Sequence, residues 1–146
     1  MTVVVPFDNS KLSQAALQRA QEIKDHSEEV LAVVVIPNNN VEFARKHDWL
    51  TDNEEFDPEI IKKRLSETVT GIVPEARLKT IATGRYAQTG QIASEIRGFA
   101  KDADARVVVI GSDNAGRITA TVGSIGRTVA TDTAYDIYVV RTHPNS

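Results

Sequence analysis

A glycine-containing loop near the carboxyl end of the chain carries the residues whose types and spacing best suit a chemical task. Residues 107–126 read VVVIGSDNAGRITATVGSIG: an apolar strand, then Gly111, a small polar loop, and Gly123 and Ser124 where a helix should begin. The N–H groups of such a loop and the free donors of a helix N-terminus converge on one point, where the helix dipole favours negative charge. The loop therefore predicts a phosphate site, with a nucleotide as the leading ligand. The alternative is a surface loop whose glycines only permit tight turns.

The ends of two other predicted strands carry further candidate ligand contacts. Asp8, two residues after Pro6, could accept hydrogen bonds from a ribose hydroxyl or a base amino group, or it could cap the following helix. The backbone around Val35 could meet an adenine edge while its side chain packs on the ring, or that side chain could simply fill the core. Ser124 and the amide of Ile125 would receive phosphates, unless Ser124 is only an N-cap. Because ligands of open α/β sheets bind beyond the carboxyl ends of the strands, we expect these residues to enclose one crevice.

Composition and charge exclude several classes of protein. The chain has 146 residues, which suits one domain, expected to span residues 1–146. Its net charge of −3 arises from interspersed acidic and basic residues, so we expect no nucleic-acid partner. The absence of cysteine excludes disulfides and thiolate zinc sites and fits a reducing cytosol. The N-terminus does not resemble a signal peptide, and the longest apolar run, 30–37, is too short for a bilayer. We therefore expect a cytoplasmic protein without a membrane partner.

Motifs for rapid chemistry are absent from the sequence. It has no GxxxxGK[ST] loop and no GxGxxG fingerprint, and Val122 stands where a nucleophile elbow requires glycine. The three histidines, His26, His47 and His143, lack metal-ligand spacing. We therefore predict no catalytic and no metal-binding residue, and at most slow ATP hydrolysis. Magnesium could accompany a bound triphosphate, although the sequence shows no carboxylate cage for it.

Predicted strands and helices alternate along the chain. Four segments are short, β-branched and continuously apolar (3–5, 30–36, 107–110 and 137–140), which is typical of parallel strands buried on both faces. A fifth segment, 76–81, alternates more and is expected nearer an edge. Helices are predicted at 11–24 with Ser10 as N-cap, from Asp57 and Pro58 onward, at 90–101, and from about 123. The pattern predicts an α/β fold: a single doubly wound domain with a five-stranded parallel sheet and helices on both faces.

One long segment resists assignment. Residues 38–56 are polar and begin with three asparagines, yet they contain Phe43, Trp49 and Phe56. A long connection in a compact domain is usually a lid, a partner surface or a mobile loop. The charged clusters at 52–57 and 62–64 are interpreted as solvated faces.

Taken together, these segments resemble the universal stress protein family. The resemblance lies in VVVPFDNSKLSQAAL (3–17), VLAVVVIP (30–37) and ARVVVIGSDNAGRITATVGSIGRTVATDTAYDIYVVR (105–141), and covers nearly the whole chain. It implies the strand order 3-2-1-4-5 and a homodimer through the last strand, here from Ile137 to Val140. It also implies a stress-response protein that binds ATP or AMP. The contacts that it implies on this chain are Pro6, Asp8, Val35, Ile110, Gly111, Asn114, Gly116, Gly123, Ser124 and Ile125.

The glycine loop departs from the pattern of the family's nucleotide-binding branch. That pattern is a glycine, two residues, a second glycine, nine residues, then Gly-Ser or Gly-Thr. Here twelve positions rather than thirteen separate Gly111 from Gly123, and Asn114 stands where the second glycine belongs, with Gly116 two residues later. Asparagine is the non-glycine residue that best tolerates a left-handed backbone, so the turn can survive. The deleted residue shifts the loop by up to about 3.5 Å, which is comparable to a hydrogen-bond length.

The sequence therefore leaves three hypotheses. The first is an ATP- or AMP-binding module that acts as a homodimer. The second is a stress protein of the same fold that binds protein partners and no nucleotide, which the altered glycine loop supports. The third is a small hydrolase or transferase, which the missing catalytic groups disfavour.

Overall fold

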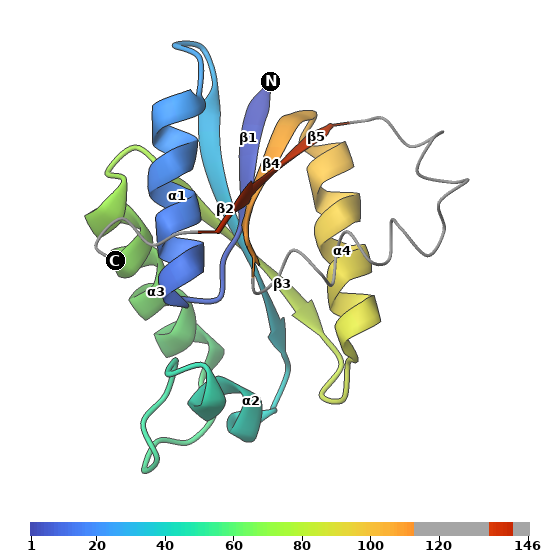
Figure 1. Ribbon diagram of the computed structural model, residues 1–146. Helices are drawn as coiled ribbons and strands as arrows, with labels where there is room; N and C mark the ends of the chain where they lie inside the picture. Colours follow the sequence, from blue (N-terminus) through green and yellow to red (C-terminus); the bar gives the residue numbers. More distant parts are fainter. Residues whose placement is uncertain (113–134, 142–146) are drawn as a thin grey trace.

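The computed structural model describes residues 1–112 and 135–141, which form a parallel β-sheet covered by helices (Figure 1). The predicted last helix and the loop residues Asn114, Gly116, Gly123, Ser124 and Ile125 lie outside the described residues. In chain order the elements are β1 (Thr2–Pro6), α1 (Lys11–Ile23), β2 (Glu29–Pro37), α2 (Val41–Lys46), α3 (Pro58–Ile72), β3 (Arg77–Thr83), α4 (Thr89–Asp102), β4 (Ala105–Gly111) and β5 (Asp136–Val140).

The strands lie in the order β3-β2-β1-β4-β5, and every neighbouring pair is parallel. Helices α1 and α3 cover one face of the sheet and α4 lies on the other (Figure 1). The predicted fold class and strand order are therefore confirmed. The chain runs outward from β1 through β2 to β3 and then returns to β4, so the strand order reverses between β1 and β4.

The valines of β1 alternate between two buried layers. Val3 and Val5 belong to the core under α1 and α3, whereas Val4 packs in the cluster that contains Ala100 of α4. A strand buried on both faces needs apolar residues at successive positions, which explains the uninterrupted runs of β1, β2 and β4. At the edge of the sheet, β3 has only Thr83 fully buried, in keeping with its more alternating sequence.

The starts of α1 and α3 follow from local capping chemistry. Ser10 caps α1, because its Oγ accepts a hydrogen bond from the N–H of Ser13 at 3.1 Å. Asp57 caps α3 by accepting from the N–H of Glu59 at 3.0 Å, with Pro58 in the first turn. Both predicted caps are confirmed.

The segment that the sequence left unassigned contains a short helix, α2. Its N-cap is Asn40, whose side chain accepts a hydrogen bond from the N–H of Phe43 at 3.0 Å. Trp49 and Leu50, which follow this helix, are buried in the core shared with α1 and α3. Residues 38–56, for which the sequence left a lid, a partner surface or a mobile loop open, therefore pack on the domain by their apolar side chains.

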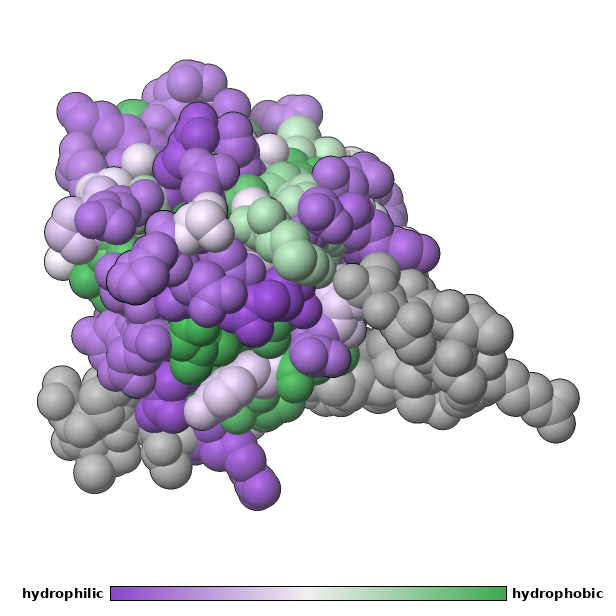
Figure 2. Space-filling view, turned by 90° about the horizontal axis from the view of Figure 1, so that it is seen from above, coloured by the Kyte–Doolittle hydropathy of each residue, from purple (hydrophilic) through white to green (hydrophobic). Residues whose placement is uncertain are grey.

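A buried ion pair joins elements at the amino ends of the strands. The Glu28 carboxylate, on a side chain only 3 % exposed, accepts hydrogen bonds from Arg106 Nε at 2.8 Å and Nη2 at 2.9 Å. Arg106 also donates to the carbonyl of Ile23 at 3.2 Å. The hydrogen bonds from Arg106 lower the pKa of Glu28 to about 2, against the opposing effect of burial. This end of the molecule is mainly hydrophilic on its surface (Figure 2).

Candidate functional site

A pocket lies at the carboxyl ends of β1, β2 and β4, beside the point where the strand order reverses. Ligands of open α/β sheets bind at this place. Helix α2 lies just beyond the end of β2, at the bottom of Figure 1, and closes one side. The pocket wall draws on three strands, the segment around α2 and the start of α4: Pro6, Phe7, Asp8, Val33, Val34, Val35, Phe43, His47, Trp49, Thr89, Ile92, Ala93, Ile96 and Ile110.

Four residues that the sequence singled out line this pocket, namely Pro6, Asp8, Val35 and Ile110. They come from the ends of three different strands, so the expected convergence on one crevice is present in the structure. Gly111 is buried at the end of β4, directly after Ile110. The five remaining predicted contacts belong to the part of the loop outside the described residues.

Asp8 belongs to the turn that leads into α1. Its Oδ1 accepts a hydrogen bond from the N–H of Ser10 at 3.0 Å, and Ser10, not Asp8, is the helix cap. The reading of Asp8 as the cap of α1 is therefore wrong. Asn9 adopts a left-handed backbone with φ of 69°, and Gln14 Nε2 donates to its side-chain oxygen at 3.0 Å. This turn directly follows β1, and Asp8 is one of the residues that line the pocket.

Three aromatic side chains form one wall of the pocket, which we call the aromatic wall: Phe43, His47 and Trp49. The rings of Phe43 and His47 stack with their centroids 4.2 Å apart. Trp49 meets Phe43 edge-on at 5.5 Å, and its centroid lies 5.2 Å from that of His47. Residues four apart share one side of a helical turn, so α2 presents Phe43 and His47 together. An aromatic and apolar wall of this kind suits a flat heteroaromatic ring.

Trp49 is held in place from three directions. Its Nε1 donates to the carbonyl of Asp8 at 3.2 Å, which ties the aromatic wall to the end of β1. Its N–H donates to the carbonyl of Ala44 at 2.9 Å, and its own carbonyl accepts from Arg64 Nη1 at 3.2 Å. The side chain is 2 % exposed. Because every polar group of Trp49 is engaged, its ring is a fixed part of the wall.

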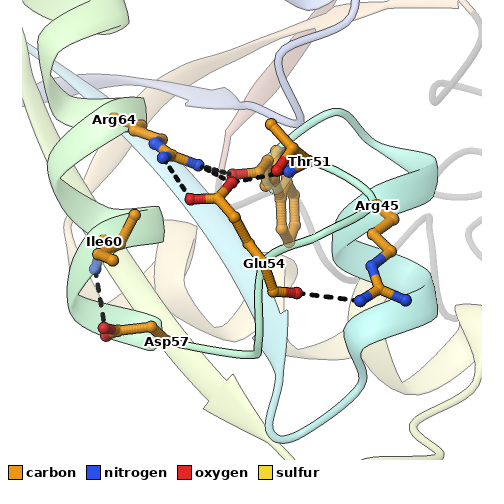
Figure 3. A network of polar contacts seen from close by, with 7 residues as sticks. Arg45, Thr51, Glu54, Asp57, Ile60 and Arg64 are labelled. Carbon is orange, nitrogen blue, oxygen red and sulfur yellow. Dashed lines mark hydrogen bonds and ion pairs between the residues drawn. The ribbon is translucent and has the colours of Figure 1, made fainter.

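A polar network around Glu54 fastens the same segment to α3 (Figure 3). Arg64 donates two hydrogen bonds to the Glu54 carboxylate, at 2.7 and 2.6 Å, and the N–H of Thr51 donates a third at 2.8 Å. Arg45 of α2 donates to the carbonyl of Glu54 at 3.0 Å. The hydrogen bonds from Arg64 lower the pKa of Glu54 to about 2. Most charged residues at 52–57 and 62–64 are exposed, as expected, and within these clusters Glu54 and Arg64 pair with each other.

The size and polar groups of the pocket limit what it can hold. Its volume is about 60 Å³, well below the roughly 300 Å³ at which whole-ligand pockets begin. The enclosed space therefore takes only part of a ligand, and the rest of a nucleotide would lie outside it. The lining residues with polar side chains are Asp8, His47, Trp49 and Thr89.

Sequence reasoning missed the aromatic wall and the contribution of α4. The available signal was the presence of Phe43 and Trp49 in a polar segment, but only tertiary packing places them beside β1. Ile92 and Ile96 both lie on α4. They are half-buried, and both line the pocket.

The described part of the chain contains neither a cluster of metal ligands nor a membrane-spanning helix. Within residues 1–112 and 135–141, no group of three or more His, Asp or Glu side chains is placed to hold a metal ion. Over the same residues, no helix combines the length and the apolar character needed to cross a bilayer.

The fold and the pocket define a doubly wound α/β protein with a pocket at the point where the strand order reverses. The sequence model of the Universal stress protein family matches residues 1–141. The chain therefore belongs to the universal stress protein family, which confirms the resemblance. No curated protein matches it at a significant level.

Three solved structures share the fold at low sequence identity. The first is hypothetical protein MJ0577, whose structure served to assign its biochemical function. The similarity has a TM-score of 0.59 and 16 % sequence identity, and it covers 98 % of this chain and 96 % of that one. The second is a universal stress protein in complex with cAMP, with a TM-score of 0.55 and 19 % sequence identity, covering 97 % of this chain and 96 % of that one. The third is a universal stress protein from Archaeoglobus fulgidus, with a TM-score of 0.51 and 17 % sequence identity, covering 96 % of this chain and 97 % of that one.

Proposed function

We propose that this protein binds an adenine nucleotide, ATP or AMP, with the base in the pocket beside Trp49, and that it acts in the stress response as a cytoplasmic binding module. The observation that carries the proposal is the meeting of Pro6, Asp8, Val35 and Ile110, from three strands, in one apolar pocket at the switch point. That a related fold was solved with cAMP supports an adenine nucleotide as the ligand class.

Each part of the ligand has a proposed partner. The side chains of Val35 and Ile110 pack against the base, and Asp8 accepts a hydrogen bond from a ribose hydroxyl. From the small pocket, the phosphates extend past Gly111 toward the loop that carries Asn114, Gly116, Gly123, Ser124 and Ile125. Since the sequence carries none of the motifs of rapid ATPases, such as a GxxxxGK[ST] loop, hydrolysis of ATP is slow at most, with or without magnesium.

We further propose that the active form is a homodimer joined through β5. This strand is an edge of the described sheet, with β4 as its hydrogen-bonded neighbour. Tyr138 and Val139 are exposed on it, at 36 % and 37 %. An edge strand with exposed apolar side chains is a suitable surface for pairing with a second copy.

The direct test is to denature the purified protein and analyse the released small molecules by mass spectrometry. The proposal predicts that adenine nucleotide co-purifies, and that added ATP or AMP raises the melting temperature of nucleotide-free protein. A clean supernatant, together with an unchanged melting temperature at millimolar ATP and AMP, would overturn it.

A second candidate function is partner binding without nucleotide. The shortened spacing between Gly111 and Gly123, with Asn114 in place of a glycine, favours it. The same melting experiment separates the two, because a protein that acts only through partners gains no stability from nucleotide.

A further inference from the structure

We propose that His47 selects the base of the ligand, by accepting a hydrogen bond at Nε2 from the 6-amino group of a purine. The inference rests on the proposed function, since it concerns how the same pocket distinguishes one nucleotide from another. It assigns a role in recognition to His47, for which the sequence patterns predicted no role.

The first step is the tautomer of the imidazole. His47 Nδ1 lies 2.9 Å from the carbonyl oxygen of Phe43. A carbonyl oxygen can only accept, so Nδ1 carries the proton and donates it. In the neutral ring Nε2 is then an acceptor with an available lone pair. Within residues 1–112 and 135–141, no group donates a hydrogen bond to Nε2.

The second step is the fixed position of the ring. His47 stacks on Phe43 at 4.2 Å between centroids and lies beside Trp49 at 5.2 Å. Together with the hydrogen bond at Nδ1, these contacts limit rotation of the half-buried side chain. The acceptor nitrogen therefore belongs to a preorganised part of the pocket wall, and recognition costs little side-chain entropy.

The third step is the kind of polar group that the wall offers. The Asp8 carboxylate accepts hydrogen bonds, and the one donor of Trp49 is already bonded to the carbonyl of Asp8. The Thr89 hydroxyl can donate or accept. A wall whose side chains mainly accept suits a ligand edge that donates. Adenine presents an amino group at position 6, whereas hypoxanthine presents a carbonyl oxygen, which would face the lone pair of Nε2.

The experiment compares AMP with IMP, which differ at position 6 and in the proton on N1. Affinities are measured by calorimetry at about pH 8.5, above the range in which histidine ordinarily titrates. We expect the unaltered protein to prefer AMP by about tenfold or more. In His47→Phe, which keeps a stacked ring and removes both nitrogens, that preference should fall by about five- to tenfold. His26→Phe, at an exposed histidine, should leave it unchanged.

The ratio of the AMP and IMP affinities distinguishes direct recognition of the base by His47 from a purely structural role of His47 in the aromatic wall. A general loosening of the pocket would weaken AMP and IMP alike and leave the ratio intact, and that result would overturn the inference while the proposed function stood. If the unaltered protein binds neither nucleotide, both the inference about His47 and the proposed function fail.

A measurement on the unaltered protein avoids any dependence on folding of the variant. In protein labelled with ¹⁵N-histidine, the Nε2 resonance of His47 should shift on addition of AMP, because its lone pair accepts a hydrogen bond. Saturation with AMP that leaves this resonance unmoved would overturn the inference.

Discussion

Asp8 contributes to the pocket through two different groups. Its backbone carbonyl accepts the indole N–H of Trp49, and its carboxylate orders the turn before α1 by accepting from the N–H of Ser10. The first contact positions the aromatic wall, and the second positions the carboxylate at the pocket. A change that alters the carboxylate and leaves the backbone in place therefore tests ligand binding more than it tests the fold.

Asp8→Asn should weaken AMP binding by about tenfold or more, because a hydrogen bond to a charged group is worth roughly 1.5–3 kcal/mol. The loss should nearly disappear with 2′,3′-dideoxy-AMP, which has no ribose hydroxyl to donate. Calorimetry on both ligands checks this, with Asp25→Asn, at an exposed aspartate, as the matched control. An equal loss with both ligands would contradict the role assigned to the carboxylate.

At the scale of elements, ion pairs fasten segments that the sheet alone does not position. Arg64 and Glu54 join the segment after α2 to α3, and Arg106 and Glu28 join the start of β4 to the turn before β2. The two pairs differ in burial, because Glu28 is almost fully removed from solvent whereas the Glu54 side chain is 26 % exposed. We therefore expect the larger effect on stability at Glu28.

Arg106→Met should lower the free energy of unfolding by about 2–3 kcal/mol, because it leaves the buried Glu28 carboxylate without its partner. Arg77→Met breaks an ion pair with Glu29 in which both side chains are more than half exposed, and should cost less than about 0.5 kcal/mol. Urea denaturation of the two variants and the parent gives both values. Similar losses in the two variants would contradict the importance of burial here.

The Glu28 pair also predicts a dependence of stability on pH. The pKa of Glu28 falls from 4.5 to about 2 in the folded protein, so its ionised form stabilises the fold above pH 4.5. That contribution is lost as the pH falls from 4.5 toward 2. The difference in unfolding free energy between the parent and Glu28→Gln should therefore be constant from pH 5 upward and shrink below it. A difference that does not change across this range would refute the assignment.

The main elements could be predicted from the sequence because each has a local cause. Uninterrupted apolar runs indicate the central strands, and Ser10 and Asp57 mark the helix starts. Helix α2 was missed because its six residues are too few to show a helical period. The pairing of Glu54 with Arg64 was also missed, since a cluster of charges does not reveal which residue on another element faces it.

The candidate site was predictable only in part, for a related reason. Residues at the ends of parallel strands meet at one edge of the sheet, so the strand pattern could place Asp8 and Val35 together, and the family resemblance added Pro6 and Ile110. Phe43, His47 and Trp49 reach the pocket through the packing of a long connection, which no periodicity encodes.

At the scale of the whole molecule, the proposed homodimer pairs through β5. Tyr138 contributes a side chain at this edge, and its hydroxyl accepts a hydrogen bond from Arg19 at 2.7 Å. Tyr138→Pro removes a backbone donor from the strand and should convert a dimer to monomers in sedimentation velocity. Tyr138→Phe removes only the hydroxyl and should remain dimeric. A Tyr138→Pro protein with the sedimentation coefficient of the parent would exclude this interface.

The intrinsic fluorescence of the protein can report on binding in the pocket, because Trp49 lines the pocket and is the one tryptophan of the chain. The most direct measurement is therefore a fluorescence titration of Trp49 with AMP, set against ribose 5-phosphate, which has the sugar and phosphate but no base. We predict a saturable change in emission with AMP and none with ribose 5-phosphate, because the proposed binding mode places the base against the aromatic wall. Emission that stays constant up to millimolar AMP, or that responds equally to ribose 5-phosphate, would contradict base binding in this pocket.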